Sequence, residues 1–240
     1  MTMGETEAQP AHIPGKTEYA TVTFANIDVS YYFRLDGGGQ DFGQDYLRAV
    51  RTLPTKPKRV FEWCSGPAFI GFSMLAHGLC DSLCLADVNP EAVEACRYTV
   101  KKNNLGDRVS VYHSDNLDGI PKSEKWDLVV SNPPHSGTNR IIREWGNNPL
   151  IYMDNEWQLH RRFWRRVKQN LNPSGVVLIQ ENSNLSRVSD FSRMIENNGM
   201  RIAFVGDLGP PYSEVAIYYI GAVREEDAST MRGIGLAQQW

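Results

Sequence analysis

The feature that most constrains the fold of this chain is the run over residues 126–135, where an apolar stretch ends in two prolines. The stretch Trp-Asp-Leu-Val-Val-Ser is rich in β-branched residues and has the length of one buried strand. Pro134 keeps Pro133 out of the helical region, and neither proline can donate a hydrogen bond to a sheet. The strand must therefore stop here, which places Asn132 at its carboxyl end on a stiff backbone.

This strand end suits chemistry on a planar nitrogen. The lone pair of an amide, ring amine or guanidine is delocalised, and it must localise before the nitrogen can attack an electrophilic methyl group. Acceptors placed where the N–H bonds point in the transition state raise the rate. The side-chain carbonyl of Asn132 and the backbone carbonyl of Pro133 are two such acceptors, and His135 would offer a flat ring to the target. The alternative interpretation is a turn that only ends a strand.

Three earlier segments also read as short apolar strands followed by polar residues, at 60–64, 82–87 and 109–112. The first leads through a Ser-Gly-Pro-Ala turn into a predicted helix, a succession typical of nucleotide-binding α/β domains. Asp87 follows Gly66 by about 20 residues, the spacing at which an acid bonds ribose hydroxyls. Its alternative role is to cap the next helix.

The run over 132–135 resembles the Asn-Pro-Pro-(Tyr/Phe) motif of class I S-adenosylmethionine-dependent N-methyltransferases. That group includes the release-factor glutamine and adenine amino methyltransferases, and His135 stands where they carry Tyr or Phe. The segment 62–68 resembles their first motif, Glu/Asp-x-Gly-x-Gly-x-Gly. Glu62 takes its acidic position and Gly66 its second glycine, while Cys64 and Ala68 replace the first and third glycines.

The resemblance implies an α/β, Rossmann-like fold with a seven-stranded, mostly parallel sheet in the order 3-2-1-4-5-7-6. It also implies that S-adenosylmethionine binds over the first three strands, where an acid after the third strand accepts from the adenine amino group. The cofactor-binding residues expected on this basis are Glu62, Cys64, Ser65, Gly66, Asp87, Val88, Asp115 and Asn116. The expected catalytic residues are Asn132, Pro133, Pro134 and His135.

The chain divides by composition into a disordered leader over 1–16, an N-terminal arm or lid over 17–58, the methyltransferase domain over 59–223 and a polar tail over 224–240. In the arm, three consecutive glycines at 37–39 predict either the hinge of a lid or a mobile linker. A single helix is expected over 156–170, with His160 on its apolar, core-facing side. The candidate substrate contacts are Phe42, Gln44 and Glu181.

Charge, hydropathy and cysteine content argue against several classes of partner. The net charge of -3 supplies no basic groove for nucleic acid, and no apolar run approaches the length of a membrane span. The four cysteines form no Cys-x-x-Cys pair and have no histidine cluster beside them, which predicts a cytoplasmic protein without a metal site.

The stretch before the core is too short for the helical domain that release-factor methyltransferases usually carry. This favours a small molecule with an amide, guanidine or heteroaromatic nitrogen as the methyl acceptor. A protein glutamine is the alternative, followed by a nucleic-acid adenine and by a binding protein without transfer activity.

Overall fold

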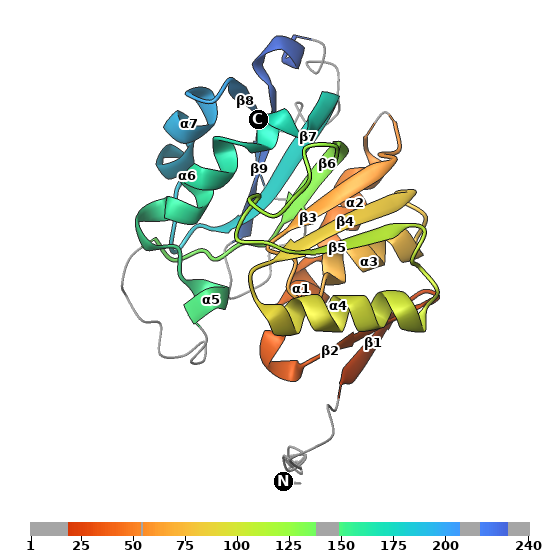
Figure 1. Ribbon diagram of the computed structural model, residues 1–240. Coiled ribbons are helices and arrows are strands. Elements are labelled where there is room, and N and C mark those ends of the chain that lie inside the picture. Colours follow the sequence, from red (N-terminus) through yellow and green to blue (C-terminus); the bar gives the residue numbers. More distant parts are fainter. Residues whose placement is uncertain (1–18, 54, 138–148, 207–216, 230–240) are drawn as a thin grey trace, which may run out of the picture.

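The computed structural model describes residues 19–53, 55–137, 149–206 and 217–229. The predicted leader and the last part of the predicted tail lie outside the described residues. Within them, the chain forms a large sheet covered by helices on both faces and a small hairpin that packs against two of these helices (Figure 1).

The large sheet has seven strands in the order β5-β4-β3-β6-β7-β9-β8. β9 runs antiparallel to both of its neighbours, and the strands from β5 across to β7 are parallel. Numbered from β3, this order is 3-2-1-4-5-7-6, so the predicted fold is confirmed. The strands are β3 (Arg59–Trp63), β4 (Ser82–Asp87), β5 (Val109–His113), β6 (Trp126–Ser131), β7 (Leu171–Asn182), β8 (Met200–Gly206) and β9 (Ile217–Arg224).

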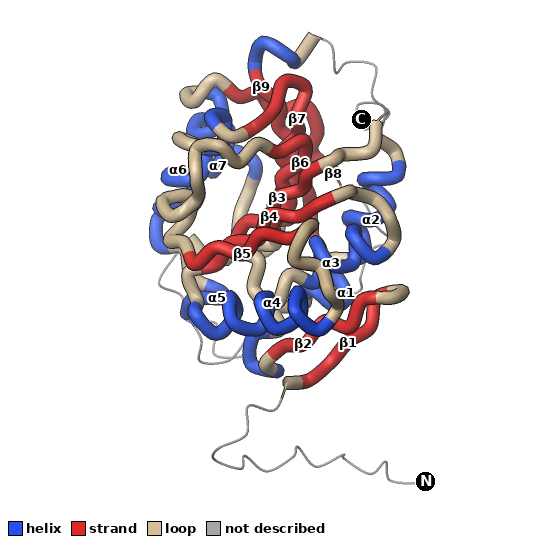
Figure 2. The backbone as a smooth tube through the Cα atoms, turned by 45° about the vertical axis from the view of Figure 1, so that its right-hand side comes forward, coloured by secondary structure: helices blue, strands red, loops and turns tan. Residues whose placement is uncertain are grey.

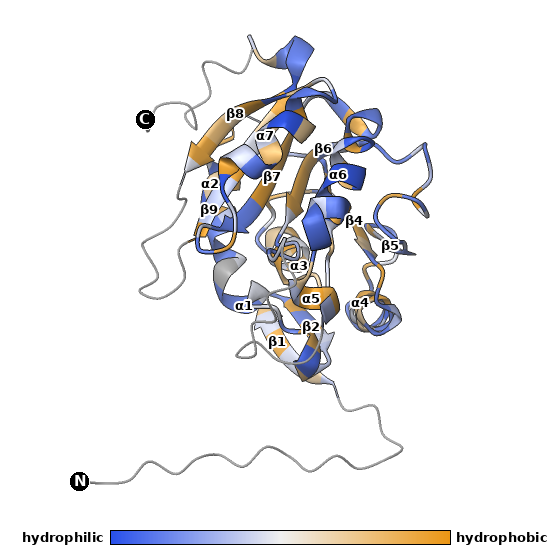
Figure 3. Ribbon diagram, turned by 90° about the vertical axis from the view of Figure 1, so that its left-hand side faces the viewer, coloured by the Kyte–Doolittle hydropathy of each residue, from blue (hydrophilic) through white to orange (hydrophobic). Residues whose placement is uncertain are grey.

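The central strands β3, β4 and β6 are hydrophobic because both of their faces are buried (Figure 3). Val60 faces one apolar core and its neighbour Phe61 faces the other, since successive side chains of a strand point to opposite faces. Helices α2 (Gln44–Arg51), α3 (Phe69–Ala76) and α4 (Pro90–Lys102) cover the first face, and α6 (Gln158–Trp164) and α7 (Val188–Glu196) cover the second (Figures 1 and 2).

The single helix expected over 156–170 is interrupted. α6 is preceded by the 3-10 turn η3 (Asn155–Trp157) and followed by η4 (Val167–Gln169). The backbone is left-handed at Glu156 and Trp157, with φ of 53° and 58°, so the helix cannot begin before Gln158. This irregular entry brings the segment before α6 back towards the sheet, where it takes part in the site.

The N-terminal arm is a hairpin followed by two short helical turns and by α2. β1 (Ala20–Phe24) pairs with β2 (Ile27–Tyr31), and the Ser30 N–H donates to Thr99 Oγ1 of α4 at 2.9 Å. η1 (Phe33–Leu35) and α1 (Gly39–Phe42) then lead towards the carboxyl ends of the central strands. None of the described helices is long and apolar enough to cross a membrane. All four cysteines are free thiols, and the cytoplasmic location inferred from them stays a prediction.

Candidate active site

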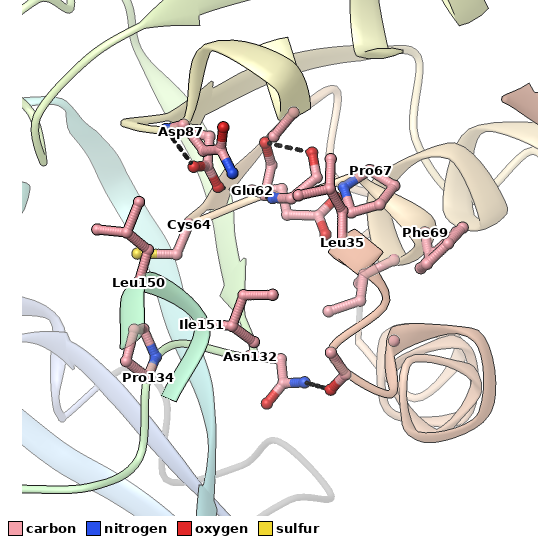
Figure 4. Close-up of a pocket in the computed structure, with 17 residues that line it drawn as sticks. Leu35, Glu62, Cys64, Pro67, Phe69, Asp87, Asn132, Pro134, Leu150 and Ile151 are labelled. Atoms are coloured by element: carbon pink, nitrogen blue, oxygen red, sulfur yellow. Dashed lines mark hydrogen bonds between the residues drawn. The ribbon is translucent and has the colours of Figure 1, made fainter. Parts of the chain in front are cut away.

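A pocket opens at the carboxyl ends of β3, β4 and β6 (Figure 4). Its floor comes from these strand ends, and its rim comes from the arm and from α5 (Pro149–Tyr152), through Leu35, Gly37 and Ile151. Seven of the residues predicted for the site line this one pocket: Glu62, Cys64, Ser65, Gly66, Asp87, Asn132 and Pro134. The polar strand ends are therefore gathered at one edge of the sheet, as parallel strands require.

The turn after β3 is left-handed at three alternate positions, Cys64, Gly66 and Ala68, with φ of 52°, 49° and 60°. These are the positions at which the resembled motif carries its three glycines. A left-handed backbone suits glycine and strains other L-residues. The turn thus adopts at all three positions a conformation that glycine favours, although only Gly66 is a glycine and the other two residues have small side chains.

Asp87 ties this turn to the second strand. One of its carboxylate oxygens accepts from Gly66 N–H at 2.7 Å, and the other accepts from Asn89 N–H at 2.8 Å. Burial raises the pKa of Asp87 above its usual range, although these N–H donors favour the charged form. The α4 cap is Asn89, whose side chain accepts from Glu91 N–H at 3.0 Å, so the capping role considered for Asp87 belongs to its neighbour.

Glu62 lies beneath the turn and is only 2% exposed. Its carboxylate accepts from Gly71 N–H at 2.6 Å in the first turn of α3, and burial raises the pKa of Glu62 to about 8. A Cβ atom on Gly71 would lie 2.6 Å from Glu62 Oε2, so only glycine at this position admits the carboxylate.

Asn132 has both ends of its side-chain amide engaged. Its Nδ2 donates to the backbone carbonyl of Gly37 at 3.3 Å, and its Oδ1 lies 2.8 Å from His135 Nε2. Because an amide oxygen can only accept, His135 Nε2 must carry the hydrogen of this bond. The arm and the Asn-Pro-Pro-His turn therefore meet at Asn132, and Pro134 lines the pocket beside it.

Behind His135 lies a buried series of charged side chains. His135 Nδ1 is 3.4 Å from Glu181 Oε2, the other Glu181 oxygen is 2.9 Å from His160 Nε2, and His160 Nδ1 is 2.6 Å from Asp154 Oδ2. The side chains of Glu181, His160 and Asp154 are at most 2% exposed. This arrangement leaves His135 as the end of the series nearest the pocket.

The opposite charges in this series stabilise one another's ionised forms. Burial disfavours the charged ring of His160, but Glu181 and Asp154 outweigh it and raise the pKa of His160 to about 9. Burial would likewise raise the pKa of Glu181, but the rings of His160 and His135 outweigh it and hold that pKa below its usual range. His160 is in the core, as expected, but its polar partners were missed because Asp154 and Glu181 come from separate segments that only the fold brings together.

Four of the predicted residues lie away from the pocket. Asp115 is more than half exposed and pairs with Arg162 of α6 at 3.0 Å, and Asn116 Nδ2 donates to the Leu159 carbonyl at 2.8 Å. Gln44 is held in α2, where its Oε1 accepts from Ser73 Oγ at 3.2 Å. Val88 is 42% exposed and is not part of the pocket lining.

The cofactor and substrate roles of these four residues stay predictions, as do those of Phe42, whose side chain lies outside the described part of the structure, and of Pro133. Glu181, the third candidate substrate contact, is buried behind His135.

The pocket fits S-adenosylmethionine by the chemistry of its lining. Asp87 offers a carboxylate at the place where ribose hydroxyls are bound in nucleotide-binding sheets. The left-handed turn brings the backbone of Gly66 to the pocket wall with little side-chain bulk, and Leu35, Phe69 and Ile151 supply apolar surface. Among the described residues, no group of three or more His, Cys, Asp or Glu side chains could hold a metal ion.

Strand order, the left-handed turn and the position of the pocket define the fold of class I methyltransferases. Solved structures agree. The Thermus thermophilus 16S rRNA N2 G1207 methyltransferase, in complex with AdoMet and guanosine, superposes with a TM-score of 0.61 at 14% identity, over 92% of this chain and 53% of that one. M. jannaschii TYW2 in complex with AdoMet gives a TM-score of 0.58 at 15% identity, over 88% of this chain and 87% of that one.

Residues 38–199 match the methyltransferase small domain, and the chain belongs to that family. The release factor glutamine methyltransferase of Clostridium acetobutylicum is 27% identical over 150 residues, covering 59% of this chain and 52% of the relative. The ribosomal protein uL3 glutamine methyltransferase of Francisella tularensis subsp. tularensis is 25% identical over 127 residues, covering 50% of this chain and 40% of the relative. The chain therefore spans about half the length of these relatives, or less.

These matches confirm the expected methyltransferase family, and the two solved structures named above hold AdoMet. They overturn one expectation. A small molecule was favoured as the methyl acceptor, but the relatives named above act on proteins, a release factor and a ribosomal protein. That expectation rested on the length of chain before the core, and this length says nothing about the chemistry of the pocket.

Proposed function

We propose that this protein transfers a methyl group from S-adenosylmethionine to the side-chain amide nitrogen of a glutamine in a protein of the translation machinery. The observation that carries the proposal is the amide of Asn132, which lies at the pocket wall with its orientation fixed from both ends. The names of the relatives support it, since both specify glutamine as the methylated residue.

A glutamine side chain is the hydrogen-bonding complement of Asn132. It offers N–H donors on the nitrogen to be methylated and a carbonyl acceptor beside it. Asn132 Oδ1 accepts from His135 with one lone pair and keeps the other for a substrate N–H. The backbone carbonyl of Pro133 is the second acceptor, and it is stiff because the next residue is also a proline.

The pocket residues then divide the task. Asp87 and the backbone of Gly66 would hold the cofactor, which supplies an electrophilic methyl group when bound. Asn132 and Pro133 would orient the two N–H bonds so that the nitrogen lone pair localises towards that methyl group. A bond forms between nitrogen and the methyl carbon as the carbon–sulfur bond breaks, and the nitrogen then releases a proton to water.

Methyl transfer to purified proteins tests this function. Release factors and ribosomal protein uL3 would each be incubated with the enzyme and radiolabelled S-adenosylmethionine, and the labelled protein would be digested and sequenced by mass spectrometry. The expected result is one methyl group on a glutamine, which disappears when that glutamine is replaced by glutamate. Labelling of another residue type, or of none of these proteins, would show that the acceptor is not the one proposed.

A further inference from the structure

The orientation of the Asn132 amide is decisive for the proposed reaction, because its two ends have opposite hydrogen-bonding properties. A half-turn about the last side-chain bond would exchange the oxygen and the NH₂ group. The flipped amide would present N–H bonds to the substrate nitrogen, whose own N–H bonds need acceptors. The protein must therefore specify which end of Asn132 faces the acceptor, beyond holding the residue in the pocket.

His135 is placed to specify it. A ring that donates from Nε2 bonds only the oxygen of Asn132, which leaves Nδ2 to face the Gly37 carbonyl. A ring with its single proton on Nδ1 would instead set a lone pair against that oxygen. The position of the His135 proton thus selects the orientation of the amide, and a phenyl or phenol ring at this position could not act in the same way.

Glu181 holds the opposite edge of the His135 ring, and it is itself fixed from several sides. His160 bonds its Oε1 at 2.9 Å, and the Ser186 hydroxyl donates to its Oε2 at 3.4 Å. Asp154 holds the far nitrogen of His160 at 2.6 Å and accepts from two backbone N–H groups, those of Leu159 and His160. Each member of the series therefore has its position set by the next.

His135 adjoins a buried cluster that is rich in carboxylates. Two buried carboxylates, Glu181 and Asp154, face a single buried cation, His160. Neutral groups also lie against Glu181 and Ser186: the Tyr218 hydroxyl is 3.1 Å from Ser186 Oγ, and the Asn182 carbonyl accepts from Ser186 Oγ at 3.1 Å. Nδ1 of His135 faces the Glu181 carboxylate at 3.4 Å and Nε2 faces the Asn132 oxygen at 2.8 Å, so the ring is held from both edges.

We propose that Glu181, fixed by His160 and Asp154, is a positioning residue that acts through His135: it holds the Nδ1 edge of the ring so that Nε2 meets the Asn132 oxygen, and this contact sets the Asn132 carbonyl towards the methyl acceptor. The kinetic part of this inference rests on the proposed glutamine methylation. Its structural part does not, because the proton on His135 can be observed without any substrate.

A double-mutant cycle separates positioning from a merely structural role. Glu181→Gln keeps the shape of the side chain and removes its charge, and His135→Phe removes both ring nitrogens. Glu181→Gln should lower kcat about tenfold or more in the wild-type background, with the KM for S-adenosylmethionine unchanged. In the His135→Phe background it should change kcat by less than about twofold, because the residue through which it acts is gone.

Glu124→Gln is the matched control. It removes a carboxylate that is 9% exposed and pairs with Arg59 at 2.7 Å, at the opposite end of β3 from the pocket. It should lower the melting temperature and leave kcat unchanged. An equal loss of kcat from Glu181→Gln in both backgrounds, or no loss in either, would overturn the inference.

Nuclear magnetic resonance of the protein labelled with ¹⁵N histidine supplies the readout that needs no methyl acceptor. The wild type should show a His135 Nε2–H signal with a contact to the Asn132 side chain, and Glu181→Gln should lose that signal or the contact. If both persist in the variant, the inference is wrong whatever the kinetics. If the wild type methylates no glutamine but the signal depends on Glu181, the proposed function fails and the positioning role stands.

Discussion

The left-handed turn after β3 leads to a prediction of unequal effects from one substitution at two buried alanines. Ala68 has φ of 60° and ψ of 42° and is fully buried. An L-residue in this conformation is strained by about 1–2 kcal/mol relative to glycine. Ala68→Gly relieves that strain, but it loses a buried methyl group worth about 0.8 kcal/mol and adds about 0.5–1 kcal/mol of chain entropy to the unfolded state. The opposing effects are similar, so the free energy of unfolding should change by less than about 1 kcal/mol.

Ala95 of α4 is the matched control, because it is equally buried but lies inside a regular helix. Ala95→Gly suffers the same two losses without any relief of strain, and it should lower the free energy of unfolding by about 1.3–1.8 kcal/mol. Urea denaturation followed by circular dichroism measures both variants, and equal m-values would show that the two states are comparable. An equal loss of stability at the two positions would mean that the turn stores no strain at Ala68.

Three further predictions concern the pocket and the buried charges. Asp87→Asn should weaken S-adenosylmethionine binding by roughly 1.5–3 kcal/mol in titration calorimetry, since it removes a charged acceptor; unchanged affinity would assign the cofactor to another group. Asn132→Ala should lower kcat about a hundredfold while the KM for S-adenosylmethionine stays the same, and transfer at the wild-type rate would reduce Asn-Pro-Pro to a strand stop. The raised pKa of His160 adds stability that is complete below its ordinary pKa and is lost as the pH rises towards about 9. Thermal unfolding between pH 6 and 9.5 should show this alkaline decline, and the decline should be weaker in His160→Gln.

The sheet order and the gathering of the strand ends were predictable because both follow from local pattern. Each buried strand is marked by its own apolar run, and parallel strands end at one edge wherever they lie in the sequence. Asp87 and Asn132 were therefore found from their places after such runs, although 44 residues of helix, strand and loop separate them. The left-handed backbone at Cys64 and Ala68 was not visible in the sequence, because neither residue type indicates a positive φ.

The buried charged series could not be predicted from the sequence for a different reason. In the sequence, His160 lies on an apolar helical stripe between Trp157 and Trp164, and nothing near it distinguishes a bonded histidine from a packed one. Its partner Glu181 is brought to it only when α6 packs across the end of β7. Asp154 reaches the ring because Glu156 and Trp157 turn left-handed just before the helix. Contacts that depend on packing and on irregular backbone produce no periodic pattern in the sequence.

The N-terminal arm combines a feature visible in the sequence with a contact that only the fold creates. The glycines at 37–39 allow a lid or a linker by sequence, and the role of the arm in closing the site stays a prediction. The Gly37 carbonyl nevertheless accepts from Asn132 at 3.3 Å and lies in the pocket wall. A glutamine that paired with Asn132 through both of its amide ends would take the hydrogen bond that Gly37 now makes. Binding of the proposed acceptor and the position of the arm are therefore coupled through one donor, while the bond from His135 can remain in place throughout.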